Sequence, residues 1–378
     1  MQTVTIIGST GSLGRKAVDI CLEKGIEVIS LAAKSNYELL CNQAIELGVK
    51  RVCIYDDKYY QPTKDLLKNT NIEVLSGEDG LIAVSEDESD MLFNVVVGMV
   101  GLKPTLAAIK RSKTIALGNK ETLVAGGELV MNALKEHKTE IIPVDSEHSA
   151  IFQCLRGNNR KELNKIILTA SGGPFFGKTI DELKNVRVED ALNHPNWSMG
   201  SKITIDSATM MNKGFEVIEA AWLFDVKPDE IEVVVHRESI IHSLVEFSDR
   251  SILAELGVPD MRIPIQLALT YPNRDICSVK AFSFTDYPAL TFYKPDRKTF
   301  RSLDICANAF EKGGLYPAVV NAANEEAVDL FLKGKCKFLQ ITDLIEEATS
   351  KLNMNIEYNL DNIYSISDEA RRLVKELI

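Results

Sequence analysis

The segment from Asp206 to Glu216 brings together groups that could do chemistry. It reads Asp-Ser-Ala-Thr-Met-Met-Asn-Lys-Gly-Phe-Glu and so combines hydroxyl, amide, ammonium and carboxylate side chains. Burying such a mixture costs free energy unless a ligand or partner satisfies it. If the segment is helical, Asn212 and Glu216 share one face, while Ser207 lies near the helix start, where N–H groups attract an anion. We interpret it as half of an active site.

A second acidic motif, Pro143-Val-Asp-Ser-Glu147, follows the apolar residues Ile141-Ile142 and is typical of a strand end. Alternation would send Asp145 and Glu147 to the same side, and two such carboxylates repel each other unless a pKa rises or a cation binds. With Glu216 they would supply three hard oxygen ligands, which suit Mg2+ or Mn2+, with Co2+ as a further candidate. The alternative is an exposed strand end, where acidic residues are common.

The chain opens with an apolar strand pattern, then three glycines, Gly8, Gly11 and Gly14, and then a helical pattern. Glycines let the backbone approach phosphates, and the helix that follows presents its N-terminus to them. The spacing Gly-x-x-Gly-x-x-Gly departs from the commoner Gly-x-Gly-x-x-Gly, so the interpretation as a pyrophosphate cradle depends on the flanking strand and helix.

The second predicted strand, residues 27–32, should end beside the adenosine ribose of a dinucleotide, where an acidic residue would select NAD. This chain has Ala33-Lys34-Ser35-Asn36 there. A cation and a hydroxyl suit a ribose 2'-phosphate, so the sequence favours NADPH over NADH. The alternative is an ordinary solvated lysine.

Two further motifs follow predicted strands. Ser171-Gly-Gly-Pro-Phe-Phe-Gly177 could hold a phosphate through the Ser171 hydroxyl and neighbouring N–H groups. The polar stretch after it ends in His194-Pro-Asn-Trp-Ser-Met-Gly200, which predicts a mobile lid that would bring His194, Trp197 and Met199 onto the site. The alternative is a surface loop that Trp197 anchors to the core.

Lys120 follows the predicted strand at residues 114–116, and open parallel sheets gather ligands at strand carboxyl ends. Lys120 could therefore meet a substrate oxygen or support the metal site; its alternative is an exposed lysine. We interpret four histidines as structural, because they lack metal-type spacing or fall within predicted strands: His137, His148, His236 and His242.

The elements that must position these groups follow an α/β rhythm. Up to about residue 143, strand-like and helix-like stretches alternate, which predicts a parallel sheet with helices on both faces. The predicted strands are residues 3–8, 28–32, 51–55, 73–75, 93–97, 114–116 and 140–143. Four more, residues 165–170, 231–236, 240–247 and 251–256, predict a second, smaller sheet. Residues 271–301 fit a linker, and the last 75 or so residues are helical in pattern.

Composition fits an enzyme of two or three units, because 378 residues exceed a single core. A net charge of −11 without a basic stripe argues against nucleic acid as a partner, and no apolar run reaches membrane-spanning length. Seven cysteines without a Cys-x-x-Cys pair indicate reduced thiols in a cytoplasm. The first residues enter a strand at once, so we expect no signal or transit peptide.

Taken in order, the motifs resemble the 1-deoxy-D-xylulose 5-phosphate reductoisomerase family over nearly the whole chain. They are Gly-Ser-Thr-Gly-Ser-Leu-Gly, Gly-Asn-Lys-Glu, Pro-Val-Asp-Ser-Glu-His, Ala-Ser-Gly-Gly-Pro-Phe, His-Pro-Asn-Trp-Ser-Met-Gly and Asp-Ser-Ala-Thr-Met-Met-Asn-Lys-Gly. The resemblance implies NADPH- and metal-dependent rearrangement and reduction of 1-deoxy-D-xylulose 5-phosphate to 2-C-methyl-D-erythritol 4-phosphate, a step of non-mevalonate isoprenoid synthesis. A retro-aldol and aldol sequence and a direct ketol shift both remain open for the rearrangement.

The resemblance also implies roles for individual residues. The metal ligands would be Asp145, Glu147 and Glu216. The phosphate would be bound by Ser171, Ser207, Asn212, Lys213 and His194. Substrate oxygens would contact Ser146 and Lys120, and the lid would close through Trp197 and Met199. NADPH would lie against Thr10, Gly11, Ser12, Leu13, Ala33, Lys34, Ser35, Asn119, Glu121 and Gly200.

The family's organisation implies a Rossmann-like NADPH-binding domain over residues 1–143 and a central α/β catalytic, metal-binding and dimerisation domain with the lid loop over 144–271. A linker over 272–300 and a C-terminal helical bundle over 301–378 would follow, assembled as a homodimer. Two departures stand out. Ala33-Lys34-Ser35 replaces Gly-Lys-Asn, and His236-Arg237-Glu238-Ser239 replaces His-Pro-Gln-Ser in a region that lies towards the family's dimer contact.

Two rival functions remain open. A metal-independent dehydrogenase of the semialdehyde type needs a nucleophilic cysteine with a histidine partner, and Cys154, the thiol nearest to the site motifs, has no such setting in the sequence. A non-catalytic NADPH-binding module would leave the acidic residues and the lid without a purpose.

Overall fold

The computed structural model describes residues 2–111, 113–197 and 199–378. The chain divides into two compact units. Unit 1 contains residues up to 122, then 130–149 and 260–279; unit 2 contains residues 123–129, 150–259 and 280–378. These units reflect packing, and the four-part functional division of the sequence stays a prediction.

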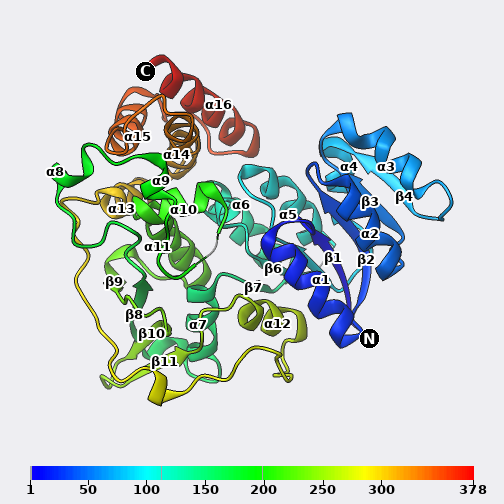
Figure 1. Ribbon diagram of the computed structural model, residues 1–378, viewed down its shortest axis with the longest axis horizontal. Coiled ribbons are helices and arrows are strands. Elements are labelled where there is room, and N and C mark those ends of the chain that lie inside the picture. The colour runs from blue at the N-terminus through cyan, green and yellow to red at the C-terminus, as the bar shows by residue number, and fades with distance from the viewer. Residues whose placement is uncertain (1, 112, 198) are drawn as a thin grey trace. The chain divides into compact units, whose positions relative to one another are not determined.

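Unit 1 is built on a parallel sheet of seven strands in the order β4-β3-β2-β1-β5-β6-β7 (Figure 1). The strands are β1 Thr3–Ile7, β2 Glu27–Ala33, β3 Arg51–Ile54, β4 Glu73–Ser76, β5 Met91–Asn94, β6 Thr114–Leu117 and β7 Ile141–Pro143. The connecting helices are α1 Ser12–Lys24, α2 Tyr37–Leu47, α3 Tyr60–Leu67, α4 Gly77–Ser85, α5 Leu102–Ile109 and α6 Lys120–His137. The chain adds strands on one side of β1 as far as β4 and then continues with β5 on the other side, and such sheets bind dinucleotides at this change in strand order.

Late in the chain, α12 Arg262–Thr270 completes the core of unit 1. Its residues Ile265, Ala268 and Leu269 are buried in the same apolar cluster as Ile6 of β1. The Arg262 guanidinium also donates to both carboxylate oxygens of Glu23 at the end of α1, at 2.6 Å each. Unit 1 is therefore closed by a helix that begins more than a hundred residues after β7, the last strand of its sheet.

Unit 2 combines a four-stranded mixed sheet, in the order β11-β10-β8-β9, with helices (Figure 1). The strands are β8 Leu163–Ala170, β9 Ile231–Val235, β10 Ile241–Phe247 and β11 Ile252–Leu256. The helices are α7 Ser146–Leu155, which begins in unit 1, then α8 Ile180–Leu183, α9 Val188–Ala191, α10 Ser201–Ala208 and α11 Met211–Phe224. The C-terminal helices are α13 Ser302–Lys312, α14 Tyr316–Leu332, α15 Gln340–Lys351 and α16 Leu360–Glu376.

The predicted fold class is confirmed: a seven-stranded parallel sheet, a second smaller sheet and a helical C-terminal part are all present. The strand predicted at residues 93–97 was wrong in its bounds, because β5 ends at Asn94 and Val97 is 72% exposed in the loop beyond it. An apolar run alone does not fix where a buried strand ends. Among the helices in the described part of the chain, none is long and apolar enough to cross a membrane.

Candidate functional site

The glycine loop after β1 is shaped by close backbone contacts. Gly8 has φ +91°, and its N–H donates to the Ala32 carbonyl at 2.8 Å. A Cβ on Gly14 would lie 2.1 Å from the Gly8 carbonyl oxygen, so only glycine fits there. The loop is also packed against the chain after β5, since a Cβ on Gly8 would lie 2.8 Å from the Val95 carbonyl carbon. Both glycines are therefore required by the backbone beside β1, where the order of the strands in the sheet changes side.

Helix α1 begins just after this loop, with Gly11 at its N-cap. Glycine brings no side-chain acceptor to the first N–H groups, which suits a helix start that receives an anion. Gly11 and Ser12 are exposed, and Thr10 and Leu13 are half-buried. At the end of β2, Ala33 is buried while Lys34 and Ser35 are exposed.

Asn119 and Glu121 tie two loops of unit 1 together. The Asn119 amide donates to the carbonyls of Val96 and Gly98 at 2.9 and 3.0 Å, and to the Glu121 carboxylate at 3.0 Å. Its own oxygen accepts from the Thr122 N–H at 3.1 Å, which caps α6. Both side chains are buried, so they fix the loop after β5 beside the start of α6.

Alternation predicted that Asp145 lies at the end of an extended strand, and the structure shows that it does not. Strand β7 ends at Pro143 and helix α7 begins at Ser146, so Glu147 lies in the first turn of a helix. The Asp145 carboxylate accepts from the Glu147 N–H at 3.3 Å and its carbonyl from the Ser149 N–H at 2.8 Å, so Asp145 caps α7. The prediction failed because an acidic residue before a short polar run fits a helix cap as well as a strand end.

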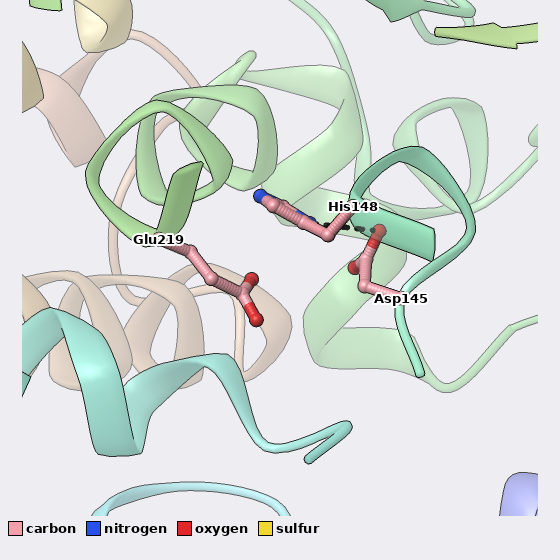
Figure 2. A group of neighbouring side chains, drawn as sticks. All are labelled: Asp145, His148 and Glu219. Atoms are coloured by element: carbon pink, nitrogen blue, oxygen red, sulfur yellow. Dashed lines mark ion pairs between the residues drawn. The ribbon is translucent and has the colours of Figure 1, made fainter. Parts of the chain in front are cut away.

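The carboxylate of Asp145 lies against the side chains of Lys120 and His148. Lys120 Nζ is 3.0 Å from one oxygen, and His148 Nδ1 is 3.4 Å from the other. Figure 2 draws the His148 pair as a dashed line, together with Glu219, a buried carboxylate of α11. Burial alone would raise the pKa of Asp145, but Lys120 and His148 outweigh it and hold that pKa well below its usual range. Asp145 is therefore ionised, as a cation ligand must be.

Two of these contacts bear on the sequence predictions. Lys120 is buried, so the alternative of an exposed lysine was wrong. His148 had been interpreted as structural because its spacing does not match a metal motif, yet it contacts the predicted ligand Asp145. Once α7 is known to be helical, the i, i+3 spacing of Asp145 and His148 explains the contact. Next to them, the Ser146 hydroxyl donates to the Glu147 carboxylate at 2.7 Å.

In unit 2, the Asp206–Glu216 segment is two helices rather than one. Ser207 lies in the last turn of α10, and α11 begins at Met211 after Met210, which has φ +64°. The prediction that Ser207 lies near a helix start was therefore wrong, because a residue in the left-handed conformation interrupts the helix. Asn212 and Glu216 do share one face of α11, as predicted, and are hydrogen-bonded to each other.

Glu216 also forms an ion pair with Lys213 on the same helix. Only 5% of Lys213 and 1% of Glu216 are exposed. The pair thus holds a predicted metal ligand against a predicted phosphate ligand within unit 2. Glu216 belongs to a different unit from Asp145 and Glu147, so the set of three metal ligands stays a prediction.

The predicted phosphate residues Ser171, His194 and Ser207 lie close together in unit 2. Ser171 Oγ is 3.0 Å from His194 Nε2. A Cβ on Gly173 would lie 2.6 Å from the Ser207 carbonyl oxygen, so the turn after Ser171 packs directly on the end of α10. Burial, and secondarily the charge of Arg237, lowers the pKa of His194 to about 4, so its ring is neutral at pH 7.

The protonated nitrogen of His194 follows from its contacts. Nδ1 accepts from the N–H groups of Asn196 and Trp197, at 3.2 and 3.0 Å. A neutral imidazole has one donor nitrogen, so the proton is on Nε2, which donates to Ser171 Oγ.

The other predicted lid residues are partly buried. Trp197 is half-buried, with its ring centroid 6.4 Å from that of His242 on β10. Met199 is also half-buried, and Gly200 is the exposed N-cap of α10. A lid and an anchored loop both fit these contacts, so the lid stays a prediction.

The sequence did not predict the contact between Arg237 and the turn that carries Ser171. The departure of Arg237 from the family pattern pointed to the dimer interface, whereas the guanidinium donates to the carbonyls of Ser171 and Gly173. Arg237 and Ser171 are 66 residues apart, and no local pattern connects them.

The chain matches known proteins over its whole length. Residues 4–127 match the family described as 1-deoxy-D-xylulose 5-phosphate reductoisomerase; residues 141–224 and 256–373 match two families described as its C-terminal domain. The protein of that name from Caldanaerobacter subterraneus subsp. tengcongensis is 50% identical over 378 residues, covering 99% of this chain and 98% of its own.

Solved structures agree. One titled as the reductoisomerase from Zymomonas mobilis in complex with NADPH has a TM-score of 0.94 at 40% identity, covering 100% of this chain and 98% of its own. One titled as DOX-P reductoisomerase in complex with NADPH, fosmidomycin and magnesium has a TM-score of 0.93 at 37% identity, with the same coverage. The chain therefore belongs to the 1-deoxy-D-xylulose 5-phosphate reductoisomerase family.

Proposed function

We propose that this protein converts 1-deoxy-D-xylulose 5-phosphate to 2-C-methyl-D-erythritol 4-phosphate, with NADPH as reductant and a divalent metal ion, Mg2+ or Mn2+, as cofactor. The names of its full-length relatives support this reaction, and so do the related structures solved in complex with NADPH and with magnesium. The observation that carries the proposal is the partly buried carboxylate of Asp145, which Lys120 and His148 hold ionised beside Glu147.

For the metal, we assign Asp145, Glu147 and Glu216 as ligands. Their carboxylate oxygens fit a hard divalent cation by donor type. The metal would act as a Lewis acid on the substrate's hydroxyketone oxygens. Lys120 would orient Asp145 and contact a substrate oxygen, while Ser146 would hold Glu147 through the hydrogen bond described above and contact the substrate as well.

For the substrate phosphate, the proposed ligands are Ser171, Ser207, Asn212, Lys213 and His194. Neutral His194 would donate from Nε2, the nitrogen that now donates to Ser171. Lys213 would turn from Glu216 to the phosphate when a metal neutralises Glu216, which keeps the local charge balanced. Trp197 and Met199 would cover the substrate and exclude water.

NADPH would supply the hydride. We assign its pyrophosphate to Thr10, Gly11, Ser12 and Leu13 at the start of α1, and its 2'-phosphate to Lys34 and Ser35 after Ala33. Asn119 and Glu121 would support the nicotinamide side by fixing the loop after β5. Gly200 would contact the cofactor from the N-cap of α10. We also propose that the protein is cytoplasmic and that it forms a homodimer. Light scattering on the purified protein would check the dimer.

The test follows NADPH absorbance with 1-deoxy-D-xylulose 5-phosphate in the presence of Mg2+ and then of excess chelator. Oxidation that requires the metal supports reaction, cofactor and ion together. Glu147→Gln should abolish turnover while NADPH binding, measured by fluorescence, persists; Glu136→Gln on α6 is the control. If folded protein with either metal oxidises no NADPH, the proposed reaction is wrong. NADPH binding alone would then favour the non-catalytic module.

A further inference from the structure

Arg237 binds the turn that carries Ser171. It follows β9 and is half-buried. Its Nη1 donates to the carbonyl oxygen of Ser171 and, at 2.8 Å, to that of Gly173. Gly172 and Gly173 have φ of +75° and +64°, so the turn bends sharply and its carbonyls need a donor that reaches both. One guanidinium nitrogen meets that need.

The guanidinium is also supported from the side. Its central carbon lies 5.1 Å from the ring centroid of Phe176, in the same loop as the turn. A cation over an aromatic face is attracted to it, and the flat guanidinium fits such a ring better than an ammonium. The side chain is thus held between a ring and two carbonyls of one loop.

The main chain of Arg237 binds the segment that carries His194, the side chain that contacts Ser171 Oγ. The Arg237 carbonyl accepts from the Asn196 side-chain amide at 2.6 Å, and that amide also donates to Ser239 Oγ at 2.9 Å. Asn196 in turn donates its backbone N–H to His194 Nδ1. Arg237 therefore contacts both the Ser171 turn, through its side chain, and the His194 segment, through its carbonyl.

We propose that Arg237 is a positioning residue for the substrate's phosphate monoester dianion, acting by holding the Ser171 hydroxyl and the His194 Nε2–H group in one fixed arrangement. This inference rests on the proposed function. Arg237 itself binds carbonyls, so its effect on the phosphate is through Ser171 and His194. Its permanent positive charge also favours neutral His194, in agreement with the lowered pKa of that ring.

The first experiment measures steady-state kinetics of Arg237→Gln, Arg237→Lys and Arg250→Gln. Arg250 is the control, because its side chain is 76% exposed on the turn between β10 and β11. Loss of hydrogen bonds from a charged donor should raise KM for 1-deoxy-D-xylulose 5-phosphate about tenfold in Arg237→Gln. KM for NADPH should stay within about twofold, since the cofactor site is elsewhere in the proposal. Arg237→Lys, which keeps the charge, should restore part of the loss.

The second experiment does not need turnover. The chain has five histidines, so ring nitrogen-15 labelling gives few signals, and His194→Gln assigns the one of interest. In the full-length wild type, the His194 signals should report the Nε2–H form and should shift when inorganic phosphate is added. In Arg237→Gln the backbone N–H groups that bind His194 Nδ1 stay in place, so the Nε2–H form should persist, but half-saturation should require about ten times more phosphate.

The outcomes separate the two proposals. Wild-type protein that fails to turn over the substrate, yet responds to phosphate only with Arg237 present, overturns the proposed reaction and keeps this inference. The inference is overturned if the wild type is active and Arg237→Gln changes neither KM nor the phosphate response of the His194 signals. Equal rises in both KM values would also overturn it, because a general structural role moves both.

Discussion

Because Lys213 and Glu216 form a buried ion pair, replacing one of them by an uncharged residue should lower the stability of unit 2. Glu216→Gln keeps the shape of the side chain but removes the charge that Lys213 binds. Breaking a buried ion pair by removing one partner costs about 3–5 kcal/mol. The amide oxygen of the glutamine can still accept a hydrogen bond from Lys213, so we expect about 3 kcal/mol, the lower end of that range.

Tryptophan fluorescence reports this unit alone, because the chain has two tryptophans, Trp197 and Trp222, and both lie in unit 2. With an m-value of about 4 kcal/mol/M in guanidinium chloride, a loss of about 3 kcal/mol lowers the midpoint by about 0.8 M. Adding Lys213→Met to Glu216→Gln should restore part of the stability, since no charge of the pair then stays buried.

The control is Asp329→Asn, which breaks the pair between Asp329 of α14 and Lys333 at the C-cap of that helix, in the same unit. Those side chains are 60% and 47% exposed, so we expect a loss of about 0.5 kcal/mol or less. Saturating Mg2+ should raise the wild-type midpoint but not that of Glu216→Gln, if Glu216 binds the metal. The reasoning is refuted if Glu216→Gln and Asp329→Asn shift the midpoint equally.

Three further results are expected. Gly14→Ala, which puts a Cβ 2.1 Å from a backbone oxygen, should lower the free energy of unfolding by about 1–3 kcal/mol in thermal unfolding and should weaken NADPH binding. The control is Gly25→Ala, whose Cβ would meet open space and which should leave NADPH binding unchanged. Lys34→Ala should weaken NADPH much more than NADH in fluorescence titrations, and equal weakening would reject its 2'-phosphate role. Burial lowers the pKa of His242 to about 4 from 6.5, so its neutral form stabilises the fold above pH 6.5, and up to about 3 kcal/mol is lost as pH falls to 4. His242→Gln should flatten that part of the curve of unfolding free energy against pH, and an unchanged slope would contradict the shift.

Most of the fold could be predicted from the sequence, because buried parallel strands are apolar runs separated by helical patterns. All seven strands of the first sheet and all four of the second were predicted, with errors at their ends such as that of β5. Strand ends depend on neighbouring loops. The Asn94 side chain, for example, donates to the Gly101 carbonyl at 3.2 Å and to Thr105 at 2.8 Å.

For the candidate site, the structure tests the predicted local structure and some contacts, while the residue roles stay predictions. Lys120 and Asp145 were both singled out, and the structure pairs them. Glu147 was assigned to a strand end but lies in a helix, and Ser207 was assigned to a helix start but lies near a helix end, because polar residues at these positions look alike in sequence. Arg237 could not have been found, since its contacts with Ser171 depend on β8 and β9 lying side by side.

The late arrival of α12 in unit 1 has a consequence for how the protein is made. The seven strands of the first sheet have all been synthesised by residue 143, but α12, which closes their core, ends only at Thr270. At a translation rate of about 5–20 residues per second, roughly 6–25 seconds pass between these points. During that interval the nascent chain exposes the apolar surface that Ile265, Ala268 and Leu269 later cover. A chaperone that binds apolar segments near the ribosome would therefore find its target on the first unit well after that unit's own sheet is complete.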